Sequence, residues 1–399
     1  MRLFVVEPLD TGGMIHYAYQ LCTAFSQEGA NVTLLTGQGY EPSGYPHQFT
    51  VIPLLNLWPT YDRQTAHPLR RFLRRPGRGL RHLQQWHKLT NYLIAQKPDL
   101  IQFGKINFPF EALFLARLRR RGIPLAQICH EFELREQGNG WRAKLGGQLY
   151  QTVYAQFDLI FFHGQANRQR FASLFQTPHS QLLTIPHGNE LIFHQQHGGP
   201  GRVQQLAHQY QLAEGQPVVL FFGNLTPSKG LPDLLEAFAL VQQQLTGAQL
   251  IVAGYPTKYI NLDNLKAQAG RLGIANSLVW DSRYLPVADV GPLMELATVV
   301  VYPYWNSTQS GSLQVAYAFG RPVIATRVGG LPEAVDEGRS GLLVEAHNPP
   351  ALAQALLSLL QQPEQATAMG HYARLMAESR FAWRPIARQI LESYASLLS

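Results

Sequence analysis

The sequence has few cysteines, and its apolar runs are short. Cys22 and Cys129 are the only two in 399 residues, and neither stands in the spacing of a metal-binding motif. This count argues against a disulfide-stapled scaffold. Every apolar run falls short of the roughly 18 residues that a membrane-spanning helix needs. Residues 1–8 are too short for a signal peptide and have no cleavage site. These absences predict a cytoplasmic protein.

Motifs for metals and for dinucleotides are also missing. The fourteen histidines form no H-x-x-x-H pattern or Cys/His cluster. No Asp-x-Asp pair occurs, because the nearest candidate, Asp281-Ser282-Arg283, ends in a cation. We therefore expect no metal site and no dependence on a metal. No G-x-G-x-x-G fingerprint follows a predicted strand, which makes a nicotinamide oxidoreductase a distant alternative.

Composition and length describe a well-packed chain with more than one core. Apolar residues make up 46% and charged residues 15%, which predicts a globular protein rather than a disordered one. A length of 399 residues suits two domains of roughly 150 to 200 residues each. The formal net charge of +7 predicts attraction to polyanions or to an anionic membrane face.

Residues 299–341 carry the strongest indication of chemistry. Val299 to Tyr302 is continuously apolar, as in a parallel strand covered on both faces. The loop from Ser307 to Ser312 then opens a predicted helix, Leu313 to Phe319. Small hydroxylated residues at a helix N-terminus suit a phosphate or a group of sugar hydroxyls, because unpaired N–H groups and the positive dipole end meet there. An ordinary N-cap explains the loop equally well.

Two further loops of the second half follow predicted strands. Gly223-Asn224-Leu225-Thr226-Pro227-Ser228-Lys229-Gly230 comes after the strand Val218 to Phe222 and before an amphipathic helix. A lysine beside the positive end of that helix suits a diphosphate, although it also suits an exposed helix start. Gly329 and Gly330 follow the strand Val323 to Ala325 and permit close backbone approach by a ligand.

The first half places two candidate features at strand ends. Gly12 and Gly13 follow the strand Leu3 to Val6 and precede a helix. His130 follows the strand Leu125 to Cys129, at the edge where ligands bind in doubly wound sheets. A tight turn and a satisfied buried histidine are the alternative interpretations of these residues.

Together these residues resemble the donor-sugar region of the family 4 (group 1) retaining glycosyltransferases, which have a GT-B fold. The pattern is A-x-x-x-G-x-P-V-I-A-T-x-x-G-G-x-x-E, matched by Ala316, Gly320, Pro322, Val323, Ile324, Ala325, Thr326, Gly329, Gly330 and Glu333. The resemblance implies an α/β chain of two doubly wound Rossmann-like domains facing a central cleft. Residues 1–195 would form the acceptor-side domain, with a C-terminal helix at 380–399 crossing back onto it. Residues 196–379 would bind the nucleotide sugar, after a linker around 195–202.

The sequence departs from the family pattern at its charged positions. The family has two glutamates eight residues apart, and those places hold Ser307 and Val315, or Thr308 and Ala316 if Gly311 sets the register. An arginine of the diphosphate loop is replaced by Asn224. The TQSG-type loop therefore resembles a variant branch without the paired glutamates, in which neutral groups recognise the sugar.

The resemblance implies a metal-independent hexosyltransferase of polysaccharide biosynthesis. It would move a sugar from a nucleoside diphosphate sugar, its only co-substrate, to a glycan, lipid-linked or small hydroxyl acceptor. The implied catalytic residues are Lys229 and His130. The implied donor-binding residues are Gly12, Gly13, Gly223, Asn224, Thr308, Gln309, Ser310, Gly311, Ser312 and Gln314. Because the carboxylates are missing, the alternative is a non-catalytic sugar-nucleotide-binding protein of the same fold.

A basic segment at residues 70–88 stands apart. Its cations are interleaved with apolar residues and comprise Arg70, Arg71, Arg74, Arg75, Arg78, Arg81 and Lys88. Such a segment, broken by Pro76 and Gly77, is typical of peripheral binding to anionic lipid on the inner face of a membrane. A solvated loop and helix is the alternative. No recognised nucleic-acid fold accompanies the segment, so we expect no nucleic-acid partner.

Overall fold

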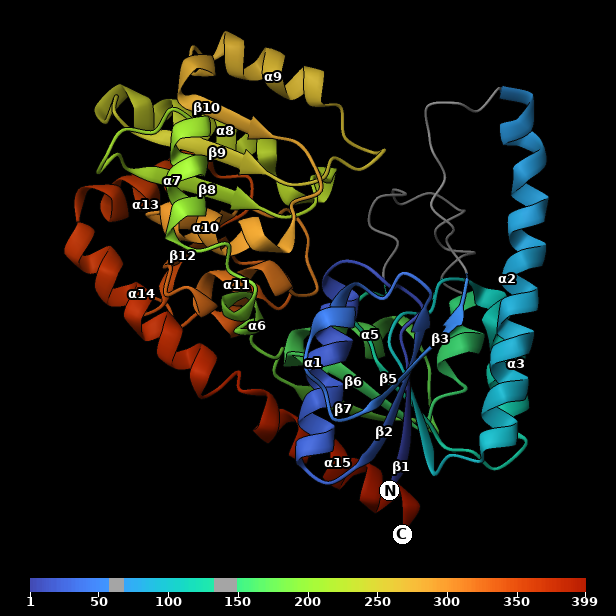
Figure 1. Cartoon of the computed structure of the whole chain (residues 1–399). Coiled ribbons are helices and arrows are strands. Elements are labelled where there is room, and N and C mark those ends of the chain that lie inside the picture. The colour runs from blue at the N-terminus through green and yellow to red at the C-terminus, as the bar shows by residue number, and fades with distance from the viewer. Residues whose placement is uncertain (57–67, 133–148) are drawn as a thin grey trace. The chain divides into compact units, whose positions relative to one another are not determined.

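The computed structural model describes residues 1–56, 68–132 and 149–399, and for residues 68–76 it describes the backbone only. The chain forms two compact units. The first comprises the described residues up to 185 together with Trp383–Ser399, and the second comprises Pro186–Ala382. Each unit has its own parallel sheet with helices packed against it (Figure 1).

The sheet of the first unit has seven parallel strands in the order β3-β2-β1-β4-β5-β6-β7. The strands are β1 (Arg2–Val6), β2 (Asn31–Gly37), β3 (Thr50–Leu55), β4 (Leu100–Phe103), β5 (Leu125–Ile128), β6 (Leu159–His163) and β7 (Gln181–Ile185). The strand order reverses between β1 and β4, which is the switch point of a doubly wound sheet. At the C-terminal edge of the sheet, the loops that follow β1 and β4 lead away from this point in opposite directions.

The helices of the first unit cover both faces of this sheet. They are α1 (Gly13–Gln27), α2 (Pro68–Gln96), α3 (Ala112–Arg119), α5 (Gln165–Leu174) and α15 (Trp383–Leu398). Right-handed crossovers run in opposite directions from the switch point, so α1 and α3 lie on opposite faces. Helix α15 packs against α1 (Figure 1), where Arg384 and Arg388 pair with Glu28 at 2.9 and 3.1 Å. The chain's last helix is thus part of its first unit.

The predicted break in the basic segment is wrong, because helix α2 spans it. The helix runs without interruption through Pro76 and Gly77 to Gln96. An internal proline costs a helix roughly 3 kcal/mol. Burial of Trp86, Leu89 and Leu93 against the sheet offsets that cost further along the helix. Among the described residues, no helix combines the length and the apolar character needed to cross a bilayer.

The sheet of the second unit has six parallel strands in the order β10-β9-β8-β11-β12-β13. The strands are β8 (Val218–Phe222), β9 (Gln249–Ala253), β10 (Leu278–Asp281), β11 (Val299–Tyr302), β12 (Val323–Thr326) and β13 (Gly341–Val344). Here the order reverses between β8 and β11. β8, β11 and β12 are apolar almost throughout and lie in the interior of the unit, as the sequence predicted. The predicted doubly wound α/β class is confirmed for both halves of the chain.

The helices of the second unit pack against its sheet and against one another. They are α6 (Ile192–Gln195), α7 (Pro200–Gln209), α8 (Leu231–Gln244), α9 (Leu262–Arg271), α10 (Val287–Leu296), α11 (Gly311–Ala318), α12 (Leu331–Ala334), α13 (Pro349–Gln361) and α14 (Pro363–Glu378). α8 packs against α13, α7 against α10, and α11 against α14.

Residues 195–202, which the sequence suggested as a linker, are held against α10 within the second unit. Gly198 donates its N–H to the carbonyl of Ala288 at 3.2 Å. Arg202 pairs with buried Asp289 at 2.6 Å. A composition rich in glycine and glutamine predicts a flexible segment. Composition does not show long-range hydrogen bonds and ion pairs such as these, which hold the segment in place.

Candidate functional site

Three loops meet at the carboxyl edge of the second unit's sheet, after β8, β11 and β12. Gly230 has a φ of +66°, and a Cβ placed on it would lie 1.8 Å from the carbonyl oxygen of Pro303. Gly329 has a φ of +53°, and its Cβ would lie 1.5 Å from the carbonyl oxygen of Ser307. Only glycine fits at these two crossings. The glycines predicted from sequence therefore let the three loops touch backbone to backbone.

Lys229 ends a short 3₁₀ helix, η4 (Pro227–Lys229), directly before α8. Its ammonium nitrogen lies 3.5 Å from the centre of the Tyr304 ring. Tyr304 is fully buried in the loop after β11, so the ring provides a fixed surface for the cation. The sequence singled out the lysine but missed this tyrosine, whose only signal was its place just beyond the end of β11.

Tyr304 connects Lys229 to the serine loop at the start of α11, with its ring against the lysine and its hydroxyl against the serines. The Tyr304 hydroxyl lies 3.3 Å from the Ser310 hydroxyl and 3.4 Å from the Ser312 hydroxyl, and these two serines are 2.8 Å apart. Ser310 is the N-cap residue of α11, but its side chain accepts no hydrogen bond from the helix. The positive end of α11 therefore receives no side-chain cap from Ser310.

The neutral side chains predicted to recognise a sugar are largely buried around this helix start. Thr308, Ser310 and Gln314 are 5%, 8% and 1% exposed. The Oε1 atoms of Gln309 and Gln314 are buried and accept no hydrogen bond from the described residues. A buried amide oxygen without a donor costs about 1–3 kcal/mol, which a ligand hydroxyl or a water would offset.

The remaining predicted residues of the second unit lie on the adjacent loop after β8. The Ser312 hydroxyl lies 3.7 Å from the point where a Cβ on Gly223 would stand, so these two loops are in contact. Asn224 is exposed beside them. The structure therefore brings Gly223, Lys229, Ser310, Gly311, Ser312 and Gln314 into one region.

Two side chains that the sequence reading missed flank Gly311. A Cβ on Gly311 would lie 3.5 Å from Cε1 of His187 and 4.0 Å from Oε1 of Glu190. Burial lowers the pKa of His187 to about 4, so its imidazole is neutral at pH 7. Glu190 is 4% exposed and brings a carboxylate to a region where the family's glutamates are missing. Its sequence signal was weak, a single acidic residue shortly after β7.

Gly12 and Gly13 open α1 in the first unit. Gly12 has a φ of +81° and donates its N–H to the Glu41 carboxylate at 2.7 Å. The same carboxylate lies 3.4 Å from Nε2 of buried His16. Glu41 thus supplies negative charge at the positive end of the α1 dipole. No local sequence pattern predicts this bond, because 29 residues separate its partners.

His130 lies beyond the end of β5 in a buried aromatic cluster of the first unit. Its ring centre is 4.6 Å from that of Tyr17 and 5.0 Å from that of His163. Tyr17 also packs edge-on against Trp383 at 4.8 Å. His130 is 8% exposed. Packing of this kind suits a structural histidine, and the predicted catalytic role stays a prediction.

Two acidic residues at or just beyond strand ends are held by neighbouring groups of their own unit. Burial raises the pKa of Glu7, just beyond β1, to about 7, while the N–H of Leu9 donates to its Oε1 at 3.0 Å. Asp281, the first residue of the nearest Asp-x-Asp candidate, is bound to Arg283 at 2.7 Å and to the Tyr210 hydroxyl at 2.6 Å. The Asp281 carboxylate is already paired within its own unit.

Two family models match the chain. "Glycosyltransferase Family 4" matches residues 11–191, and "Glycosyl transferases group 1" matches residues 216–362. A D-inositol 3-phosphate glycosyltransferase of Segniliparus rotundus is 30% identical over 287 residues, which are 70% of this chain and 62% of that protein. A GDP-mannose-dependent alpha-(1-6)-phosphatidylinositol monomannoside mannosyltransferase of Mycolicibacterium smegmatis is 30% identical over 59% of this chain and 61% of that protein. These matches span about three fifths of each relative's length.

Solved structures share the fold over almost the whole chain. Sucrose-phosphate synthase from Thermosynechococcus elongatus has a TM-score of 0.74 at 19% identity and covers 99% of this chain and 98% of its own. Anabaena HepE in complex with UDP-glucose has a TM-score of 0.73 at 19% identity and covers 99% of this chain and 100% of its own. At such identities the likeness establishes the two-domain fold.

Proposed function

Since the chain belongs to the family 4 glycosyltransferases, we propose that it is a retaining enzyme that transfers a sugar from a nucleoside diphosphate sugar to a hydroxyl acceptor. The single observation that carries this proposal is the arrangement of Lys229, Tyr304 and the serine loop at the start of α11. A fixed cation beside a helix N-terminus suits a diphosphate, because both supply positive charge to its oxygens. The HepE structure contains UDP-glucose, which supports a donor of this class.

The proposed chemistry follows from where charge develops. The bond between the anomeric carbon and the diphosphate oxygen breaks, and the acceptor oxygen bonds to that carbon from the same face. The acceptor's proton passes to the departing phosphate oxygen, and a nucleoside diphosphate is released. Lys229 and the start of α11 then stabilise the leaving group's growing negative charge. Protein groups orient the reactants, and no metal takes part.

The buried amides of Gln309 and Gln314 and the hydroxyl of Thr308 would bind the donor's sugar hydroxyls. Sugar recognition would then depend on neutral donors and acceptors, supplemented by the Glu190 carboxylate. In the first unit, the Gly12 and Gly13 loop and His130 would face the acceptor and the transferred sugar.

The experiment that tests the proposal is incubation with a panel of nucleotide sugars and hydroxyl acceptors, followed by mass detection of nucleoside diphosphate and product. Metal-free buffer with a chelator should leave turnover unchanged. A protein that binds a donor but releases no nucleotide with any acceptor would be the non-catalytic binder, which the missing glutamates favour.

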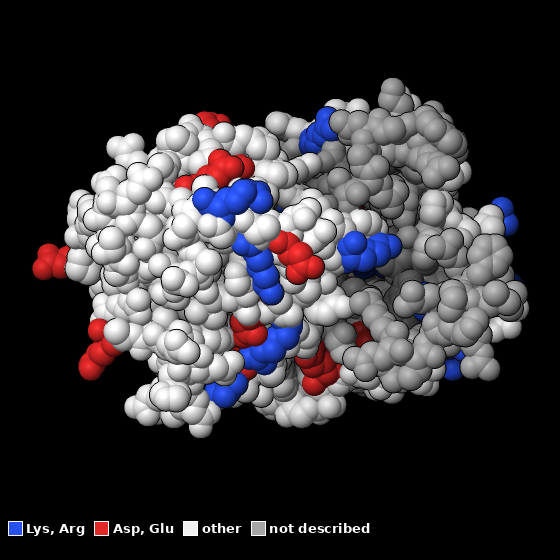
Figure 2. All heavy atoms as spheres, turned by 90° about the horizontal axis from the view of Figure 1, so that it is seen from above, with Lys and Arg blue, Asp and Glu red and all other residues white. Residues whose placement is uncertain are grey.

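We also propose that the acceptor is lipid-linked or close to an anionic membrane. Support comes from α2, where Arg78 and Arg81 are exposed together with Leu80 and Leu83, at 59% and 40%. The side chains of Arg70, Arg71, Arg74 and Arg75 lie outside the described residues. Basic and acidic residues are interspersed on the face seen in Figure 2, so the net charge is not gathered into one field there.

A further inference from the structure

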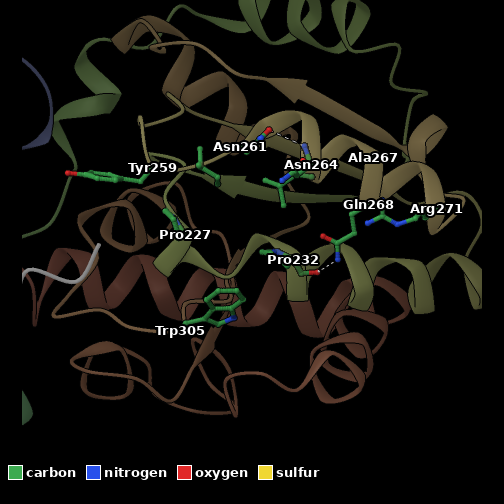
Figure 3. A pocket seen from close by; sticks show the side chains of 11 residues that line it. Pro227, Pro232, Tyr259, Asn261, Asn264, Ala267, Gln268, Arg271 and Trp305 are labelled. Carbon is green, nitrogen blue, oxygen red and sulfur yellow. Dashed lines mark hydrogen bonds between the residues drawn. The ribbon is translucent and has the colours of Figure 1, made fainter. Parts of the chain in front are cut away.

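A groove of about 430 Å³ lies in the second unit between η4, the start of α8 and helix α9 (Figure 3). We call it the Trp305 groove. Flat apolar surfaces line part of it, contributed by Pro227, Pro232, Tyr259 and Trp305. Planar polar side chains of α9 line another part, including Asn264, Gln268 and Arg271. Its volume lies within the usual range of small-ligand sites.

Trp305 is fixed in place before any ligand arrives. Its indole N–H donates to Oδ2 of Asp233 at 2.6 Å, and its backbone N–H donates to the carbonyl of Ser228 at 2.8 Å. The imidazole of His347 packs against its ring at 4.9 Å between centres. A rigid aromatic surface loses little entropy when a ligand binds to it.

The polar wall is also partly fixed. The amide nitrogen of Gln268 donates to the carbonyl of Pro232 and to Oε1 of Glu236, both at 3.3 Å. Its amide oxygen accepts no hydrogen bond from the described part of the chain and remains available to a ligand. Asn264 and Arg271 are exposed on the same helix, and Figure 3 shows their side chains beside the groove.

We propose that the Trp305 groove binds a segment of neutral oligosaccharide. A sugar ring has an apolar C–H face that packs on tryptophan, tyrosine or proline, and a rim of hydroxyls that bonds to amides and guanidinium groups. An anionic ligand fits less well, because Arg271 is the only cation of the lining. Ile260, Leu265 and Ala267 add apolar surface to the lining. A purely apolar chain still fits less well than a sugar, because it would leave the polar groups of Asn261, Asn264, Gln268 and Arg271 without partners in the ligand.

The groove lies next to the proposed donor region, because the same two loops contribute residues to both. Pro227 belongs to the same 3₁₀ helix as Lys229, and Trp305 directly follows Tyr304. A glycan held in the groove would therefore be kept close to the diphosphate loops. Binding there does not require transfer, so the site can be tested apart from the proposed activity.

The test is affinity gel electrophoresis of the full chain in gels that contain dextran, mannan, starch or glucomannan. We expect at least one of these neutral polysaccharides to retard the protein. Tyr259→Ala and the pair Asn264→Ala with Gln268→Ala should each weaken that retardation about tenfold, equivalent to roughly 1.4 kcal/mol. Lys266→Ala, an exposed α9 variant outside the lining, should match the wild type.

The Lys229→Ala variant distinguishes failure of glycan binding from failure of the proposed transfer activity. It should be retarded like the wild type even where transfer is lost. The inference is overturned if none of the four polysaccharides retards the chain, if the groove variants run like the wild type, or if Lys229→Ala alone abolishes retardation. Thermal unfolding of each variant checks that the fold is retained.

Discussion

The ammonium nitrogen of Lys229 lies 3.5 Å from the centre of the Tyr304 ring, and the hydroxyl of that ring reaches Ser310 and Ser312. One buried aromatic side chain therefore positions both the cation and the serine loop. Groups held in place before the reaction need no reorganisation as charge develops, which is the condition under which electrostatic stabilisation is most effective.

Lys229→Ala should lower the rate of sugar transfer by on the order of a hundredfold or more, by analogy with deletion of one preorganised electrostatic donor. Lys229→Arg should restore only part of the rate, because a planar guanidinium cannot occupy the position of an ammonium. Steady-state kinetics with a nucleotide sugar measures both. Wild-type turnover in a folded Lys229→Ala protein would remove the central support for the donor site.

Tyr304→Phe and Tyr304→Leu separate the ring from its hydroxyl. Phenylalanine keeps the surface under Lys229 and loses the serine contacts, so we expect about 1 kcal/mol less stability and a rate within a few-fold of wild type. Leucine removes the cation–π contact, and the rate should fall about tenfold further. Equal rates for the two variants would show that the ring does not hold the lysine for catalysis.

Glu190→Gln tests whether this carboxylate takes the place of the missing glutamates. A hydrogen bond from a sugar hydroxyl to a carboxylate contributes about 1.5–3 kcal/mol. The variant should therefore raise the KM for the donor roughly tenfold or more, while affinity for the nucleoside diphosphate alone stays unchanged. Glu236→Gln, an exposed carboxylate on α8, is the matched control. A parallel loss of nucleoside diphosphate affinity would point to a general structural effect.

Glu7 should make the first unit less stable as pH rises. Burial raises its folded pKa from 4.5 to about 7, so its protonated form is favoured in the native state. The stability contribution is fully present below pH 4.5 and is lost between about pH 4.5 and 7, amounting to roughly 3 kcal/mol.

Glu7→Gln should remove that pH dependence and stabilise the protein at pH 8. The glutamine oxygen can still accept the N–H of Leu9. Urea unfolding at pH 5 and pH 8 measures the difference for both proteins. An identical pH dependence in the variant would mean that another group titrates in this range.

Replacement of Arg70, Arg71, Arg74 and Arg75 by glutamine should release the protein from anionic vesicles. Each basic residue near such a surface contributes about 1 kcal/mol at moderate salt. Sedimentation with phosphatidylserine vesicles at low and high salt measures the effect. If neither the substitutions nor high salt weakened vesicle binding, α2 would be excluded as the membrane-binding segment. Arg117 and Arg119→Gln on α3 provide a control with fewer charges removed.

The sequence by itself determined the alternation of strands and helices, the buried parallel strands and the loops at their carboxyl edges. These features depend on apolar periodicity, on glycine and on residues a few positions apart, so they are readable along the chain. Lys229 was found for the same reason, since it stands between a predicted strand and a predicted helix.

Only the tertiary structure decided which side chains surround those loops. The bond from Gly12 to Glu41 spans 29 residues, and the positions of Glu190 and Gly311 are more than 100 residues apart. The pairing of Lys229 with Tyr304 likewise joins two separate strand ends. Parallel pairing aligns the carboxyl ends of β1 and β2 in the first unit, and of β8 and β11 in the second, which brings Glu41 to Gly12 and Tyr304 to Lys229. No local pattern in the sequence encodes this alignment.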